Sequence, residues 1–197
     1  AAGLLLGALS FAVEPYLTII ALVGVAAMYI VLLSPEIGVI FIITALPFLT
    51  TMMLVGLTLW TFTAFFIKLL RGKRTIKFEL FDIMLLIFMG IYILGGIVSA
   101  DTASSFKASM VFVCFMLAYI LVVNLVNTTE KLLRCVHGML MASLFVSLIG
   151  VLQYVTGSAD SLWQDTSMFS DISGRVVSTF ANPNVLAEYL ILMIPFA

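Results

Sequence analysis

The feature that most constrains this chain is a series of strongly apolar runs that are almost free of charged residues. A bilayer core about 30 Å thick is crossed by about 20 apolar residues in an α-helix. The clearest runs of nearly that length are Tyr16–Leu33, Leu80–Val98, Met110–Val126 and Cys135–Val155. Of the 197 residues, 63% are hydrophobic and 10% are charged, whereas about 25% of a soluble domain is charged. The sequence therefore predicts an all-α integral membrane protein, built as a polytopic helix bundle.

A longer apolar run, Ile37–Leu70, carries no charge before Lys68. As one helix it would be about 51 Å long, which exceeds a single crossing. Pro47 and the polar pair that follows it lie where a turn would divide the run. We predict two short spans, roughly Ile37–Leu49 and Met52–Leu70, with one tilted or broken helix as the alternative.

The two ends suggest that the sequence is part of a longer protein. It starts with Ala1 rather than Met, and it stops at Ala197 within an apolar run. Residues 1–13 lack the basic region of a signal peptide, so we expect a truncated transmembrane helix there. We predict a single transmembrane domain over residues 1–197, with about six full spans and a truncated span at each end.

The distribution of basic residues predicts the orientation. Five of the nine Lys and Arg residues cluster in or beside one short loop: Lys68, Arg71, Lys73, Arg74 and Lys77. Cytoplasmic loops of membrane proteins are enriched in Lys and Arg, so loop 71–79 is predicted to be cytoplasmic. A lipid-headgroup or nucleic-acid patch is the weaker reading, and a net charge of −1 argues against a nucleic-acid partner.

The remaining loops agree with this orientation. Lys131 and Arg134 fall on the predicted inner side, whereas only Lys107 and Arg175 fall outside. The segment 156–184 is then an extracytoplasmic loop, the longest polar stretch of the chain.

Several local features carry smaller predictions. Ser99–Ser109 should be a polar outer loop, and Thr129 or Asn127 should cap the next helix. Gly95 and Ser99 leave one helix face small enough for close helix contact. Glu79 and Asp82 should flank the cytoplasmic boundary. The two Cys residues, Cys114 and Cys135, are expected to be packed free thiols.

The polar residues that could carry chemistry crowd into the last two dozen positions. Asn182-Pro183 predicts a helix start, which would leave N–H groups of Asn184 and Val185 free to favour an anion. Arg175 lies a few residues upstream, and Arg suits bidentate phosphate contact. Glu188 lies one turn into the helix, where a charge near the membrane requires a partner or a cavity.

Plainer interpretations of the same residues stay open. Arg175 could simply pair with Asp171, four residues earlier, and Asn182-Pro183 could be a helix cap and nothing more. Glu188 could be stabilised by the helix N-terminus instead of acting as a base that activates an acceptor.

The stretch GRVVSTFANPNVLAEYL, from Gly174 to Leu190, resembles the R-x-x-x-T-[FL]-x-N-P-N-x-x-A-x-Y-L signature of bacterial O-antigen ligases and O-antigen polymerases. That family also includes protein O-oligosaccharyltransferases. The preceding Gly150 to Tyr154, GVLQY, is similar to the G-x-x-Q-Y ending of the span before that loop. The resemblance is specific over Gly150–Leu190 and loose elsewhere.

This resemblance implies a multi-pass enzyme of the bacterial cytoplasmic (inner) membrane. Its members transfer a glycan from an undecaprenyl-diphosphate carrier to an acceptor, which is a lipid, another glycan or a protein, with no metal and no cofactor. A glycan- or diphosphate-proximal role is carried onto Arg175, Asn182 and Asn184, which match the signature, and Glu188 is added as a substrate-binding residue. The catalytic residues are unknown, because the family's catalytic His and further Arg residues lie beyond this motif. His137, the single His, falls on the predicted cytoplasmic side and is read as a packing residue.

Two other classes of protein stay open. A membrane transporter or lipid flippase subunit could use the same anion site, with Glu188 as a coupling residue and a split helix at Pro47. A structural membrane protein without activity is the third hypothesis.

Overall fold

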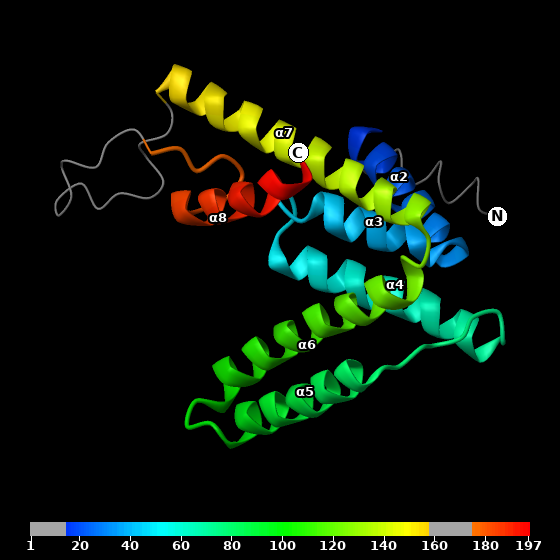
Figure 1. Ribbon diagram of the computed structural model, residues 1–197. Coiled ribbons are helices and arrows are strands. Elements are labelled where there is room, and N and C mark those ends of the chain that lie inside the picture. Colours follow the sequence, from blue (N-terminus) through cyan, green and yellow to red (C-terminus); the bar gives the residue numbers. More distant parts are fainter. Residues whose placement is uncertain (1–14, 158–174) are drawn as a thin grey trace. The chain divides into compact units, whose positions relative to one another are not determined.

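The computed structural model describes residues 15–157 and 175–197, and within these ranges all the regular secondary structure is helical (Figure 1). The predictions for residues 1–13, and for most of the outer loop, Asp171 included, lie outside these ranges. Seven α-helices are described: α2 (Pro15–Leu33), α3 (Pro35–Ala45), α4 (Thr51–Leu70), α5 (Leu80–Val98), α6 (Thr102–Leu125), α7 (Thr129–Thr156) and α8 (Pro183–Met193). A 3₁₀ turn, η2 (Ile194–Phe196), follows α8.

Four of the described helices, α4, α5, α6 and α7, are long and apolar enough to cross a membrane. Their apolar side chains are largely exposed, and only 11% of the α5 window is buried inside the protein. Large exposed apolar surfaces of this kind are unfavourable in water. The all-α membrane character predicted from composition is therefore confirmed at the level of four candidate spans.

The predicted break in the long apolar run is also confirmed. Helix α3 ends at Ala45, and the Phe48 and Leu49 N–H groups donate to the Ala45 carbonyl in the turn around Pro47. The predicted span Ile37–Leu49 is wrong in length, because the eleven residues of α3 reach only about 16 Å. Pro47 cannot continue the helix hydrogen bonding, which explains the early end.

The described residues divide into two compact units, the first formed by residues 15–39 and 56–125. In this unit a very close contact joins α3 to α4. A Cβ added to Gly38 would lie 2.5 Å from the Thr61 Oγ1 and 2.9 Å from a Val31 methyl group. Thr61 is completely buried, and its hydroxyl donates to the Leu57 carbonyl, 2.8 Å away. Glycine therefore lets the two backbones approach, as small residues do between membrane helices.

The basic loop of the first unit is tied to the start of α3. Arg74 forms an ion pair with Glu36, and the Lys68 ammonium donates to the Leu33 carbonyl at the end of α2. These contacts place the start of α3 and the basic loop at the same end of the first unit.

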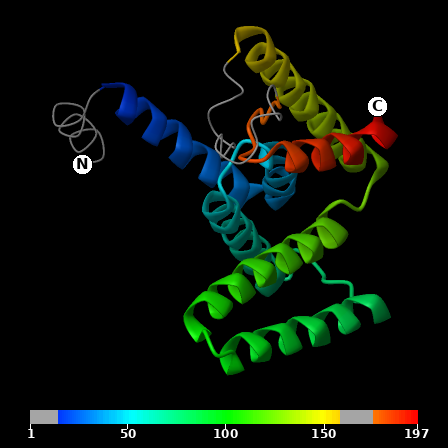
Figure 2. The same cartoon turned by 90° about the vertical axis from the view of Figure 1, so that its left-hand side faces the viewer.

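Helices α5 and α6 form an antiparallel hairpin, which both views show side by side (Figures 1 and 2). Glu79 and Asp82 form a reciprocal capping box at the start of α5, in which the Asp82 carboxylate accepts from the Glu79 N–H at 2.8 Å. Asp82 is only 5% exposed, and the ring of Tyr119 on α6 lies against the ring of Phe81, the residue before Asp82. The buried carboxylate is thus satisfied by the helix end.

The predicted outer loop Ser99–Ser109 is wrong for most of its length, because α6 begins at Thr102. Asp101 accepts from the Ser104 N–H at 3.3 Å, as an N-cap does. A hydrogen bond from the Ser104 side chain, and to a smaller extent one from its backbone N–H, holds the pKa of Asp101 below its usual value. Because the folded-state pKa is lowered, this stabilisation is present at neutral pH and is lost as the pH falls through that pKa.

Serine hydroxyls make the polar first turns of α6 compatible with a helix. The Ser109 hydroxyl donates to the Ser105 carbonyl at 2.8 Å, and it is covered by Gly96 of α5, where an added Cβ would lie 2.4 Å from the Ser109 Oγ. The close contact between α5 and α6 is therefore at Gly96, and the predicted contact at Gly95 is wrong. Among the described atoms, an added Cβ at Gly95 has no neighbour within 4 Å.

The second unit contains residues 40–55, 126–157 and 175–197. Helix α7 begins at Thr129, and its N-cap is Thr128, whose side chain accepts from the Lys131 N–H at 3.4 Å. The predicted caps, Thr129 and Asn127, are wrong by one residue. A close glycine contact also links α7 to α3, since a Cβ at Gly138 would lie 2.3 Å from the Thr44 Oγ1.

The predicted orientation can be tested by thiol labelling of the full-length protein. The native thiols Cys114 and Cys135 are both buried, so they can be replaced by alanine to give a background without native thiols. Ala100→Cys, in the turn between α5 and α6, should react with a membrane-impermeant maleimide added to intact cells. Lys73→Cys, in loop 71–79, should react only after the membrane is permeabilised. Both positions are exposed, and labelling in the reverse pattern would overturn the orientation.

Candidate functional site

The segment that precedes α8 is fixed to α7 by a single forked side chain. The Gln153 amide oxygen accepts from the Ser178 N–H at 2.7 Å, and the Gln153 amide nitrogen donates to the Ser178 carbonyl at 2.9 Å. One side chain thus satisfies both backbone groups of one residue, which are separated from it by 25 positions in sequence. Buried backbone groups need such partners, and this segment has no strand or helix to provide them.

Ser178 occupies a backbone conformation that is unusual for its residue type. Its φ is 52°, the single positive φ of a non-glycine residue in the part of the chain that the structure describes. Such conformations cost about 1–3 kcal/mol and persist where the surroundings fix them. The Phe180 N–H donates to the Val177 carbonyl across the turn, and the Ser178 hydroxyl donates to the Val146 carbonyl of α7 at 2.6 Å.

Gly150 allows the segment to lie this close to α7. A Cβ there would approach a Val176 methyl group at 3.3 Å and the Ser178 Cβ at 3.9 Å. Gly150 and Gln153 are three residues apart, so they lie on one face of α7. The GVLQY stretch thus provides a small residue for close approach and an amide for the fork.

Helix α8 is capped locally and packs on α7 through its own apolar side chains. The Asn182 side chain accepts from the Asn184 N–H at 2.8 Å, and Pro183 occupies the first helical turn. The predicted helix start is confirmed. Three buried residues of α8 then pack against Val146 of α7 in one apolar cluster: Leu186, Tyr189 and Met193. The Phe180 ring lies against the Tyr189 ring, with centroids 5.3 Å apart.

The capping bond corrects one prediction about the anion site. The Asn184 N–H was expected to be free, but it is already used by the Asn182 side chain. The cap satisfies an N–H that a helix end leaves unpaired. An anion at this position must therefore rely on side chains more than on that backbone group.

The predicted substrate-binding residues lie close together in sequence but differ in exposure. Asn182 is half-buried because of its capping role, whereas Arg175, Asn184 and Glu188 are exposed. Asn184 and Glu188 are four residues apart on α8, which places them on one face of the helix, away from the residues that pack on α7. His137, on α7, is exposed and bonds to the Leu133 carbonyl of its own helix at 2.7 Å.

An apolar groove of about 330 Å³ lies beside this segment, within the second unit. Its walls come from one face of α7, from Val176 and from α8; the lining residues are Val146, Ser147, Gly150, Val151, Tyr154, Val176, Leu186 and Leu190. The side chains in the groove are almost all apolar. The segment thus has an apolar cleft on one side and exposed polar groups on α8.

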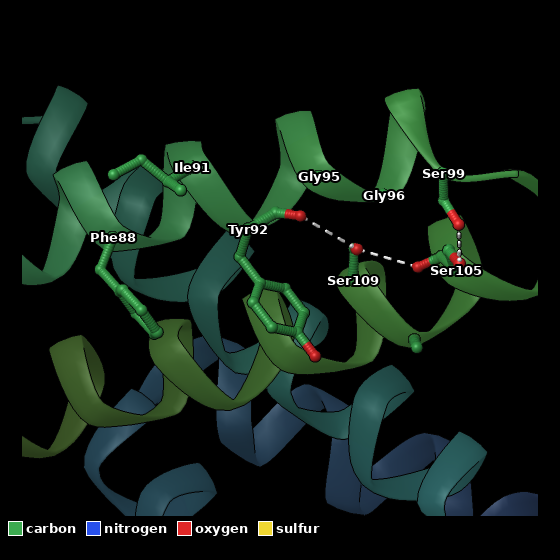
Figure 3. Close-up of a pocket in the computed structure, with 9 residues that line it drawn as sticks. Phe88, Ile91, Tyr92, Gly95, Gly96, Ser99, Ser105 and Ser109 are labelled. Atoms are coloured by element: carbon green, nitrogen blue, oxygen red, sulfur yellow. Dashed lines mark hydrogen bonds between the residues drawn. The ribbon is translucent and has the colours of Figure 1, made fainter.

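Another pocket, of about 350 Å³, lies at the end of the α5–α6 hairpin, in the first unit (Figure 3). Tyr92 and Phe88 form one side of it, and Ser99, Ser105 and Ser109 form the other. The Ser105 hydroxyl donates to the Ser99 hydroxyl at 2.8 Å, and the Ser109 hydroxyl donates within the hairpin. Because these hydroxyl groups serve the hairpin itself, this pocket is a weaker candidate for a site.

Two residues that fix the position of this segment, Gln153 and Ser178, are not among the site residues predicted from the sequence. Gln153 is visible in the sequence as a polar residue near the end of an apolar span. It lies in the GVLQY stretch, which carries part of the family resemblance. Ser178 has no signal in the sequence, because a positive φ at serine results from the tertiary contacts around it. Among the described residues, no group of three His, Cys, Asp or Glu side chains could hold a metal ion.

Comparisons of the chain with protein-family models, with curated proteins and with solved structures found no match. The resemblance to O-antigen ligases and polymerases therefore stays a prediction from the residues of Gly150–Leu190.

Proposed function

We propose that the protein transfers an oligosaccharide from a polyprenyl-diphosphate carrier to an acceptor at the outer face of the bacterial cytoplasmic membrane. The observation that carries the proposal is the docking of the Arg175–Asn182 segment onto α7. The two parts of the sequence that resemble the family, GVLQY and the stretch from Arg175 to Leu190, contact each other through Gln153 and Ser178. A shared structural role explains why both parts would occur together in one chain.

The chemistry requires few protein groups. The bond between the sugar and the diphosphate breaks, and the polyprenyl diphosphate leaves with the electron pair. The acceptor hydroxyl oxygen forms the new bond to the sugar, and its proton passes to the leaving diphosphate or to solvent. Negative charge increases on the leaving diphosphate, and a cationic or hydrogen-bonding group placed beside it lowers the barrier.

Arg175, Asn182 and Asn184 are proposed as donor-side groups, and Glu188 as a group near the acceptor. Arg175 provides a guanidinium that matches phosphate geometry. The exposed Asn184 amide provides a donor one turn before the Glu188 carboxylate on the same face of α8. We further propose about six complete membrane spans, with loop 71–79 cytoplasmic and residues 156–184 outside.

The capping role and the proposed binding role of Asn182 can be separated by Asn182→Asp. Aspartate keeps the oxygen that accepts the Asn184 N–H, and it suits a helix N-terminus, so thermal stability should be unchanged or slightly higher. The added negative charge should weaken binding of a diphosphate, raising KM for the donor about tenfold or more. Asn182→Ala is the matched variant, because it should lose about 1 kcal/mol of stability through the cap. Unchanged donor binding in Asn182→Asp would argue that Asn182 is a cap alone.

A transporter or lipid flippase subunit is the alternative, and the short helix α3 favours it. The eleven residues of α3, with the turn at Pro47, resemble the broken helices on which transporters build their ion sites. The two proposals differ in the fate of the donor. A flippase moves the lipid-linked glycan across the membrane intact, whereas a transferase cleaves it.

A further inference from the structure

We infer that Gln153 is a positioning residue for this site. It fixes the turn at Ser178, and the turn sets the course of the chain through Thr179, Asn182 and Asn184. The inference rests on the proposed function, because it assigns a role in glycan transfer to a residue that does not touch the donor. Its structural part, the forked contact itself, can be tested separately.

The fork is specific to an amide side chain. Gln153 both accepts from and donates to the backbone of Ser178, which copies the pair of bonds that a neighbouring β-strand would make. A carboxylate of the same length can accept but not donate, and a thioether cannot donate and accepts only weakly. The neighbours of Gln153 on α7, Leu152 and Tyr154, are exposed, and neither forms part of the fork.

The fork holds a conformation that the segment would not adopt alone. Serine at a φ of 52° is disfavoured, and a backbone released from Gln153 should relax towards negative φ. A change at Ser178 redirects the residues that follow it. Thr179, the next residue, is exposed, and Asn182 and Asn184 follow within six positions.

The packing of α8 on α7 comes mainly from its own side chains, although Val176 and Phe180 of the segment also lie against this cluster. Leu186, Tyr189 and Met193 attach α8 to Val146 by apolar contact, and the Asn182 cap is local. Loss of the fork should therefore shift the turn while α8 stays docked. This separates a positioning role from a general structural one.

The experiment uses Gln153→Met and Gln153→Glu in the full-length protein, with hydrogen exchange as the first measurement. In Gln153→Met the Ser178 amide should exchange about tenfold faster, as expected for the loss of one hydrogen bond, whereas the amides of α8 should be unaffected. In Gln153→Glu the Ser178 amide keeps its acceptor and should exchange at an intermediate rate. Ser143→Ala is the matched control, because it removes a bond to the Leu140 carbonyl of the same helix and leaves the segment untouched.

The second measurement is steady-state transfer from a polyprenyl-diphosphate-linked oligosaccharide. Gln153→Met should lower kcat by about a hundredfold, as misplacement of groups by about 1 Å does, with a smaller change in KM and a melting temperature close to that of the wild type. Unchanged exchange at Ser178 would overturn the fork. Faster exchange with unchanged kcat would overturn the positioning role and leave the fork in place. A wild-type protein that transfers no glycan would overturn the proposed function and, with it, the positioning role.

Discussion

Arg175→Ala in the full-length protein is expected to abolish glycan transfer and to cause the lipid-linked glycan to accumulate. Arg175 is exposed at the start of the docked segment. Removing one group that stabilises developing charge lowers rates by about 10²–10³-fold. The measurement is the amount of lipid-linked donor and of glycosylated acceptor in cells that carry the variant as their single copy of the gene.

Two matched variants make this result interpretable. Arg134→Ala removes an exposed arginine on α7, whose partner is Glu130 one turn earlier, and it should leave transfer unchanged. Arg175→Lys keeps the charge but loses the bidentate geometry, so it should retain a small part of the activity. Normal transfer by Arg175→Ala would remove Arg175 from the proposed site.

Gly38→Leu is expected to cause the largest loss of stability. The added side chain would have to occupy space already filled by Thr61 and Val31, which lie 2.5 Å and 2.9 Å from the first atom added. Overpacking of this kind costs about 3 kcal/mol or more, because the backbones of α3 and α4 must separate. Thermal unfolding of the purified protein in detergent measures the effect.

Gly56→Leu, on α4, is the matched control for this substitution. Among the described atoms, a Cβ at Gly56 meets nothing within 4 Å, so leucine should fit and should gain up to about 1 kcal/mol from its better helix propensity. Equal losses of stability at Gly38 and Gly56 would contradict the close contact between α3 and α4.

The helices could be predicted from the sequence where apolar runs ended at strong local signals. Leu80–Val98 was predicted with its observed bounds, because a basic loop precedes it and a polar turn follows it. The start of α6 is predicted too late because serine and threonine are typical of loops, whereas here the Ser109 hydroxyl bonds to a helix carbonyl and lies against Gly96. Helix α3 was predicted too long because the effect of Pro47 extends back to the preceding turn.

Only those parts of the candidate site that depend on residues close together in the sequence could be predicted. The Asn182 cap and the start of α8 depend on neighbouring residues, and the sequence shows them directly. The fork between Gln153 and Ser178 joins residues 25 positions apart, and the positive φ of Ser178 depends on that contact. Single-sequence patterns contain no record of such pairs, so the contact that holds the segment on α7 had to come from the structure.

The central claim is that the protein cleaves a lipid-linked glycan, and the fate of the donor tests it most directly. The full-length protein is placed in liposomes with a polyprenyl-diphosphate-linked oligosaccharide and an acceptor, and the free polyprenyl diphosphate is measured by mass spectrometry. We predict that it appears in step with the glycosylated acceptor, and that Arg175→Ala prevents both. Donor that stays intact, whether it crosses the membrane or does not move, would contradict the claim.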